Sequence, residues 1–225
     1  MAPVNSDCYD TLAEYYHLIF DDWDKSIERQ AAVLNPLIVK QTGRSSVNLL
    51  DCACGIGTQA IGFAQAGHRV VASDLSRAAV ARAEREARQR HLDISFFVSD
   101  MTSLEEIADG GFTVVAALDN ALPHLPASQI LQAVRTMGSK LEPRGLFMAS
   151  IGTTTISSFN DRRFRDLLST ASEGRGGSFT RFGTGSMTRN TRFTFTSRRN
   201  PARNGLRIIL QLDIAVCCAR NSRLH

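Results

Sequence analysis

The sequence predicts an α/β protein built on a doubly wound, mostly parallel sheet. A strand, a glycine turn, a helix and a second strand follow one another between Asn48 and Asp74. Apolar strands and amphipathic helices then alternate as far as Ile151, which is typical of βα units with right-handed crossovers. A length of 225 residues with 43% hydrophobic residues suits one domain with a sizeable core.

The first strand leads into a turn that contains two glycines. Residues 47–50 are an apolar run of strand length, and the segment 51–57, Asp-Cys-Ala-Cys-Gly-Ile-Gly, follows without a helical period. Gly55 and Gly57 present no side chain to a ligand that approaches the backbone, and both tolerate a positive φ. We expect a ligand to lie against this turn.

A helix and a second strand follow the turn. The helix is expected over residues 58–66 and is closed by Gly67, and the strand over 68–72 presents Asp74 at its carboxyl end. A carboxylate at this place accepts hydrogen bonds from a ribose diol in nucleotide-binding βαβ units. The turn lacks the third glycine of the dinucleotide fingerprint, which favours a cofactor without a pyrophosphate over a nicotinamide.

The remaining core elements follow from apolar period and length. Ser76 is the expected N-cap of a helix over residues 77–91, whose many charges are interpreted as a solvated face. The most apolar strand, over 112–118, is expected at the sheet centre. The other expected elements are the strand 94–98, the helix 127–141 and a fifth strand over 146–151 after the loop 142–145.

An amino-terminal helical region precedes the sheet. Residues 10–38 have a helical period, interrupted at 21–24, and one expected apolar face holds Leu12, Tyr15, Tyr16 and Ile19. Aromatic residues at this spacing are either core or part of a helical cap over a ligand. We therefore divide the chain into a helical cap (1–45), a core (46–151) and a carboxyl-terminal segment (152–225).

The glycine turn resembles motif I of the class I S-adenosylmethionine-dependent methyltransferases, and Val70-Val71-Ala72-Ser73-Asp74 resembles their motif II. The form Asp-x-Ala-Cys-Gly-Ile-Gly, with Ala53, is similar to the glycine and sarcosine N-methyltransferase-like group. The resemblance implies a Rossmann-like fold and S-adenosyl-L-methionine as cofactor.

The same resemblance implies roles for individual residues. Arg29 would meet the methionyl carboxylate, and Asp100 and Met101 would flank the adenine, although Asp100 can instead cap a local turn. The implied cofactor-binding set is Arg29, Asp51, Ala53, Gly55, Gly57, Asp74, Leu75, Asp100, Met101, Leu118 and Asp119.

Asn120 and His124 are the candidate catalytic residues. They follow the fourth strand as Asn-x-x-x-His-Leu, which is similar to the glycine N-methyltransferase family, and the carboxyl ends of strands are where ligands collect. The Asn/Asp-Pro-Pro-Tyr box of nucleobase methyltransferases is absent from the sequence. The resemblance implies methyl transfer to a small molecule, for example an amine such as glycine or a derivative. In-line displacement needs positioning of the acceptor and no metal.

The cysteine spacing and the lengths of the apolar runs indicate where the protein is located and which partners it has. Five cysteines without CxxC spacing indicate neither a disulfide framework nor a zinc site. No run of eighteen apolar residues occurs, so a cytoplasmic protein without a membrane partner is expected. The expected partner is a small-molecule methyl acceptor, nucleic acid is not expected, and a homo-oligomer remains open.

The charge changes sign along the chain. Of the 26 basic and 22 acidic residues, 13 and 18 lie within residues 1–151, and 13 and 4 lie beyond, where every basic residue is arginine. With suitable codons, residues 151–158 can be read in a shifted frame as Arg-Asp-Tyr-Asp-His-Leu-Ile. That peptide resembles the segment after the fifth strand in glycine N-methyltransferase-like proteins.

We hypothesise that a single-base frameshift near Ile151, in the gene or its sequencing, replaced the native end with this atypical tail. Residues 206–218 are nevertheless apolar enough to pair as a strand. Three functional alternatives stay open: a cofactor-binding but inactive methyltransferase, an RNA methyltransferase that uses the basic tail, and a nicotinamide-dependent oxidoreductase.

Overall fold

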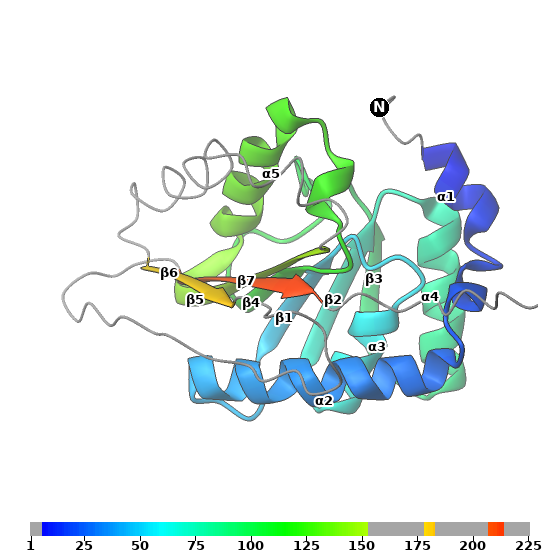
Figure 1. Ribbon diagram of the computed structural model, residues 1–225, viewed down its shortest axis with the longest axis horizontal. Helices are drawn as coiled ribbons and strands as arrows, with labels where there is room; N and C mark the ends of the chain where they lie inside the picture. Colours follow the sequence, from blue (N-terminus) through cyan, green and yellow to red (C-terminus); the bar gives the residue numbers. More distant parts are fainter. Residues whose placement is uncertain (1–5, 153–177, 183–206, 214–225) are drawn as a thin grey trace, which may run out of the picture.

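A computed structural model describes residues 6–152, 178–182 and 207–213. Its centre is a seven-stranded sheet in the order β3-β2-β1-β4-β5-β7-β6, and every strand pair is parallel (Figure 1). This confirms the predicted doubly wound α/β class. The strands are β1 (Asn48–Cys52), β2 (Arg69–Asp74), β3 (Ile94–Val98), β4 (Phe112–Ala117), β5 (Leu141–Gly152), β6 (Ser178–Phe182) and β7 (Arg207–Asp213).

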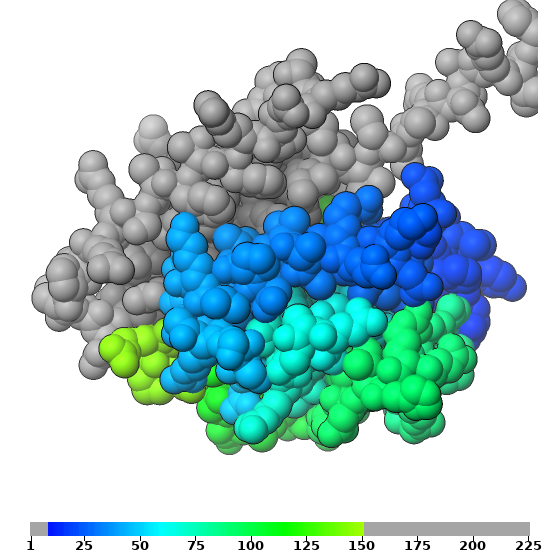
Figure 2. Space-filling model, turned by 90° about the horizontal axis from the view of Figure 1, so that it is seen from below, coloured from blue at the N-terminus to red at the C-terminus, as the bar shows by residue number. Residues whose placement is uncertain are grey.

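Helices cover both faces of the sheet. On one face, α2 (Trp23–Thr42) and α3 (Thr58–Gln65) contribute Leu34, Ile38 and Phe63 to an apolar cluster with the strands. On the other face, α5 (Ala127–Ser139) contributes Val134 and Met137. Figure 2 shows α2, in blue, lying across the molecule beside α3 and α4 (Arg77–Gln89). Burial of apolar side chains on both faces explains why the central strands are apolar throughout.

The structure confirms two predicted elements and lengthens a third. All six residues of β4 are buried at the sheet centre, and the Ser76 side chain accepts a hydrogen bond from the Ala79 amide as the N-cap of α4. The prediction that residue 51 already belongs to the turn is wrong. Asp51 pairs with Ala72 of β2 and Ala116 of β4, so the strand continues to Cys52.

The expected loop 142–145 is part of β5. Leu141 pairs with Phe112 and Leu146 pairs with Val114, so the register shifts between the two pairs. Arg144 has a φ of 66° within this irregularity. The extra residues bulge out of the ladder and do not end it, which the sequence pattern did not indicate.

The amino-terminal cap is broken into three pieces: α1 (Ser6–Leu12), the 3₁₀ turn η1 (Tyr16–Ile19) and α2. The predicted common apolar face is wrong, because Leu12, Tyr15 and Ile19 are 44%, 66% and 57% exposed. A shared face requires one continuous helical period. The break after Leu12 rotates these side chains away from the protein.

The interpretation of the α4 charges as a solvated face is also wrong in part. Glu86 is buried and forms ion pairs with Arg82 of α4 and with Arg90, the C-cap residue of that helix. Both guanidinium groups lie over the Trp23 ring of the cap, at 6.0 and 5.2 Å from its centroid. These charges therefore fasten the cap to α4.

The sheet continues into the carboxyl-terminal segment. The predicted pairing capacity of residues 206–218 is confirmed over 207–213, where β7 pairs with β5, and β6 lies at the sheet edge. Most of the segment 151–158, on which the frameshift hypothesis depends, lies outside the described residues, so that hypothesis and the division at residue 152 stay predictions. In the described ranges, no helix is long and apolar enough to cross a membrane.

Candidate functional site

The carboxyl edge of the sheet gathers three of the predicted site residues. Asp51 lies near the end of β1, and Asp74 ends the neighbouring strand β2. Asp119 follows β4, which pairs with β1 on its other side. Because parallel strands end at the same edge, these three carboxylates surround the start of the glycine turn.

The two glycines of the turn have different roles. Gly55 has a φ of 55°, and a Cβ atom added there would meet nothing within 4 Å. Gly57 has a φ of 92°, and its Cβ would lie 3.1 Å from the Cβ of Ala83 on α4. Gly57 therefore allows the first turn of α3 to pack closely against α4, whereas Gly55 leaves open space above the backbone. The backbone at Gly55 is therefore open to the approach of a ligand.

Asp74 faces this open space. Its Oδ2 accepts a hydrogen bond from the Gly55 amide at 2.8 Å, and its Oδ1 accepts one from the Ser76 amide at 2.9 Å. Burial raises the pKa of the Asp74 carboxyl, and the backbone hydrogen bonds oppose that shift. A carboxylate has further lone pairs, so it can still accept hydrogen bonds from a ribose diol. The residues present fit a nucleoside cofactor.

Asp51 and Asp119 are held by the first turn of α3. The Ala60 amide donates to Asp51, whose Oδ2 is buried without a hydrogen-bond partner. The Gln59 amide nitrogen donates to Asp119 Oδ2 at 2.6 Å and to Gln30 Oε1 of α2 at 2.7 Å. Burial raises the pKa of Asp51 well above its usual value, and the negative charge of Asp119 adds to this.

The candidate catalytic residues lie beside the cap. Asp119 and Asn120 have φ values of 50° and 63°, a conformation that residues other than glycine adopt rarely, and such strain concentrates at functional sites. His124 of the turn η2 (Leu122–His124) interacts with the Tyr9 hydroxyl of α1 at 3.3 Å. Loss of hydration on its packed side lowers the pKa of His124.

The charge of Asp119 also affects the ionisation of the Tyr16 hydroxyl. Burial, followed by the charge of Asp119, raises its pKa to about 12. The neutral phenol is therefore the form present at neutral pH. The cap thus brings Tyr9 and Tyr16 toward the end of β4, where an acceptor is expected.

Other predicted cofactor residues lie around the same edge, and Arg29 is an exception. Leu75 is 55% exposed directly after Asp74, and Leu118 is buried directly before Asp119. Asp100 accepts from the Thr102 amide at 2.7 Å, so it caps its local turn as the alternative interpretation expected. Arg29 is exposed on α2, and its guanidinium donates to Ser26 and not to a site residue.

Four polar residues of this region were missed by the sequence interpretation: Tyr9, Gln30, Gln59 and Thr58, which accepts from the Trp23 indole at 2.9 Å. Gln59 stands in the first turn after motif I, where a buried polar side chain points to a site. Gln30 carries no such signal, because only the tertiary packing of α2 on α3 brings it near Asp119.

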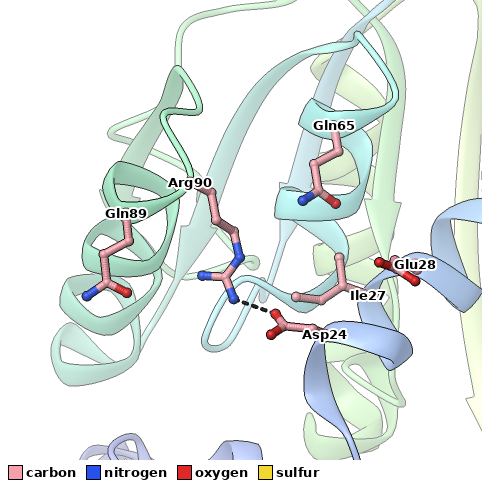
Figure 3. Close-up of a pocket in the computed structure, with 6 residues that line it drawn as sticks. All are labelled: Asp24, Ile27, Glu28, Gln65, Gln89 and Arg90. Carbon is pink, nitrogen blue, oxygen red and sulfur yellow. Dashed lines mark hydrogen bonds and ion pairs between the residues drawn. The ribbon is translucent and has the colours of Figure 1, made fainter.

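A separate cavity of about 490 Å³ lies between α2, α3 and α4. Figure 3 shows the ion pair between Asp24 and Arg90 across it, with a length of 2.6 Å. Its lining residues are Asp24, Ile27, Glu28, Gln65, Gln89 and Arg90. It contains no residue of the predicted site, so the glycine turn remains the candidate site.

Comparison with protein families supports the assignment of the core. Residues 49–145 match the family model described as a methyltransferase domain. A protein of Geobacillus sp. (strain WCH70), whose name places it among the methyltransferases, is 26% identical over 172 residues. The match covers 73% of this chain and 64% of the relative, so the chain spans less than two thirds of that protein's length.

Solved structures share the fold. The magnesium protoporphyrin IX methyltransferase of Synechocystis PCC 6803, solved with bound S-adenosylmethionine, aligns with a TM-score of 0.59 at 17% identity over 87% of this chain and 97% of its own. An S-adenosylmethionine-dependent methyltransferase from Clostridium acetobutylicum aligns with a TM-score of 0.51 at 19% identity, over 62% of this chain and 56% of its own. Streptomyces venezuelae DesVI aligns with a TM-score of 0.51 at 25% identity, over 59% of this chain and 54% of its own. Residues 49–145 thus match a methyltransferase-domain model, and the chain shares its fold with S-adenosylmethionine-dependent methyltransferases of known structure.

Proposed function

We propose that this chain transfers a methyl group from S-adenosylmethionine to a small-molecule acceptor. One observation carries the proposal: Asp74 is held between the Gly55 and Ser76 amides, directly beside the open space above Gly55. This arrangement offers a carboxylate to the ribose and bare backbone to the rest of the cofactor. The methyltransferase-domain match over the same residues supports it.

When bound, the cofactor supplies an electrophilic methyl group on a sulfonium. The protein then has to position the acceptor in line and exclude water, and no covalent intermediate is needed. Asn120 and His124 follow the strand end that faces the cap, so they are the residues that would orient the acceptor. Tyr9, in contact with His124, would close this side.

The acceptor that we propose is an amine, such as glycine or a derivative. The support is the similarity of the segment that contains Asn120 and His124 to the glycine N-methyltransferase family. An amine reacts through its neutral lone pair, and partial burial of the acceptor favours that form. Incubation of the chain with labelled cofactor and a panel of amines, carboxylates and hydroxyl compounds tests this choice.

Calorimetry on the full chain tests the cofactor. S-adenosylmethionine and S-adenosylhomocysteine should bind and NADH should not. Asp74→Ala should weaken binding of S-adenosylmethionine by about 1–3 kcal/mol, because hydrogen bonds to a charged acceptor are lost. Gly55→Val should abolish binding, because the side chain enters the open space above the turn. The positive φ disfavours a β-branched residue, so we expect a local loss of stability in a chain that still folds.

The open alternatives give different results in the same experiment. Binding of the cofactor without transfer to any acceptor would indicate an inactive relative. Transfer to RNA would favour a role for the arginine-rich end. That part of the sequence contains 13 basic and 4 acidic residues. Binding of NADH, with no affinity for S-adenosylmethionine, would overturn the proposed function.

A further inference from the structure

The glycine turn has an unusual backbone conformation and leads into a helix whose start has no side-chain cap. Ala53, Gly55 and Gly57 have φ values of 64°, 55° and 92°. Gly57 is the N-cap residue of α3, and among the described residues no side-chain hydrogen bond caps this helix, whereas Asp22 caps α2 and Ser76 caps α4. A positive φ costs free energy at an alanine, and glycine allows many other conformations. Contacts from other elements must therefore hold the turn in its shape.

Trp23, the first residue of α2, supplies such a contact. Its indole Nε1 donates a hydrogen bond to the Thr58 hydroxyl at 2.9 Å, and both side chains are buried. Thr58 directly follows Gly57 and begins α3. Ile56 of the turn belongs to the same buried apolar cluster as Trp23. The amino-terminal cap is thus linked to the residues on both sides of Gly57.

The charged cluster beside α4 fixes the direction of the indole. The guanidinium groups of Arg82 and Arg90 lie over the Trp23 ring, and Glu86 pairs with both. These contacts restrict rotation of the ring, so its N–H stays directed at Thr58. A turn that is already ordered loses little conformational freedom when a ligand binds, and this favours affinity.

We propose that Trp23 is a positioning residue for the cofactor. Through Thr58, it keeps the glycine turn in the conformation that leaves Gly55 open and lets the Gly55 amide donate to Asp74. The inference rests on the proposed function. Trp23 acts through Thr58 and needs no contact with the cofactor. Without its N–H, the turn samples other conformations, and the ligand has to order the turn at a loss of affinity.

Two substitutions remove this hydrogen bond from its two ends. Trp23→Phe removes the N–H donor and keeps an aromatic ring for Arg82 and Arg90. Thr58→Val removes the hydroxyl and keeps the branched shape. Thr58→Ser keeps the hydroxyl, so it should restore the hydrogen bond and the affinity that Thr58→Val loses.

Thr113→Val is the matched control. Thr113 is 4% exposed, as Thr58 is, and its hydroxyl accepts a hydrogen bond from Arg44 at 3.1 Å. It lies at the start of β4, at the opposite edge of the sheet from the glycine turn. This variant removes the same chemical group from a buried site, and it should leave the cofactor affinity unchanged.

Calorimetry of the full chain with S-adenosylhomocysteine measures affinity at a temperature where thermal denaturation shows each variant to be folded. Trp23→Phe and Thr58→Val should each weaken binding by about three- to tenfold. The double variant should bind no more weakly than the weaker of the two, because both changes remove one hydrogen bond. Thr58→Ser and Thr113→Val should bind as the unaltered chain does.

Two results would overturn the inference and spare the proposed function. One is unchanged affinity in both Trp23→Phe and Thr58→Val. The other is equal weakening by Thr58→Val and Thr58→Ser, which would assign Thr58 a role in packing alone. If Trp23→Phe does not fold, the two variants of Thr58 decide between these outcomes. Failure of the unaltered, folded chain to bind S-adenosylhomocysteine would instead remove the proposed function, and the inference with it.

Discussion

Glu86 and Asp51 are both buried carboxylates, and the protein treats them in opposite ways. Glu86 on α4 lies between Arg82 and Arg90, and their hydrogen bonds and charges hold the pKa of its carboxyl below the usual value despite burial. Asp51 on β1 has no basic partner among the described residues, and burial with the charge of Asp119 raises its pKa. The ion-paired Glu86 holds two arginines against the amino-terminal cap, whereas the unpaired Asp51 lies at the candidate site.

The largest expected effect comes from breaking the compensated cluster. Glu86→Gln removes the negative charge between Arg82 and Arg90, which also lie over the Trp23 ring. We expect the free energy of unfolding to fall by about 2–3 kcal/mol, because two partly buried guanidinium groups lose their shared buried carboxylate and keep only the exposed Glu14 and Asp24 as partners. Chemical denaturation monitored by Trp23 fluorescence measures this change.

Glu84→Gln on the same helix is the control. Glu84 pairs with Arg88 at the surface, where both side chains are largely exposed. Such a pair contributes at most about 0.5 kcal/mol. Equal losses in the two variants would show that the cluster is not held by buried charge.

Substitution of Asp51 should change the free energy of unfolding in the opposite direction to substitution of Glu86. Asp51→Asn should raise the free energy of unfolding of the ligand-free chain by on the order of 1 kcal/mol at a pH above the raised pKa of the Asp51 carboxyl, since the variant buries no charge there. Thermal denaturation without cofactor measures this. A large loss of stability would mean that the Asp51 charge is compensated in solution.

The pH dependence of the free energy of unfolding tests the same difference between Asp51 and Glu86. Asp51 has a raised pKa when folded, as have Asp74 and Asp119, so the folded chain binds more protons than the unfolded chain above the usual carboxyl pKa of 3.8. The free energy of unfolding should therefore fall as pH rises from that value through the raised pKa values, and then level off. The nearby Tyr16, with its pKa of about 12, does not titrate in this range.

The paired Glu86 contributes with the opposite slope. Its pKa is lowered in the folded state, so its stabilisation is present at neutral pH and is lost as the pH falls through the lowered value. Denaturation curves of Asp51→Asn and Glu86→Gln, each compared with the unaltered chain across pH 3–8, separate the two contributions. If both variants change the slope in the same direction, the contrast between the carboxylates fails.

The smallest effect is expected at a fully solvated pair. Lys25 and Asp22 form an ion pair at 3.0 Å, but both are exposed. Lys25→Gln should leave the denaturation midpoint unchanged, because water screens the pair, while Asp22 still accepts from the backbone amide of residue 25 as the N-cap of α2. A clear shift would show that distance alone, without burial, decides the strength of these pairs.

Prediction from sequence succeeded where a local signal determines structure. The glycine turn, the Ser76 cap and the apolar strand over 112–118 each depend on a few adjacent residues, and all three are present. It failed at the apolar face of the cap and at the charges of α4. Both depend on how a separate element packs, which periodicity does not contain.

The sequence by itself determined the order of strands and helices, the glycine turn and the presence of Asp74 at a strand end, because backbone preference and apolar period act over a few residues. Only the tertiary structure decided which carboxylates are compensated. Asp51 and Asp119 are 68 positions apart in the chain, and they meet because β1 pairs with β4. Glu86 differs from them because its arginines lie one helical turn away on either side. The sequence shows which residues can carry a charge. The pairing of strands and the packing of helices decide the burial and the neighbouring charges that shift the pKa of each residue.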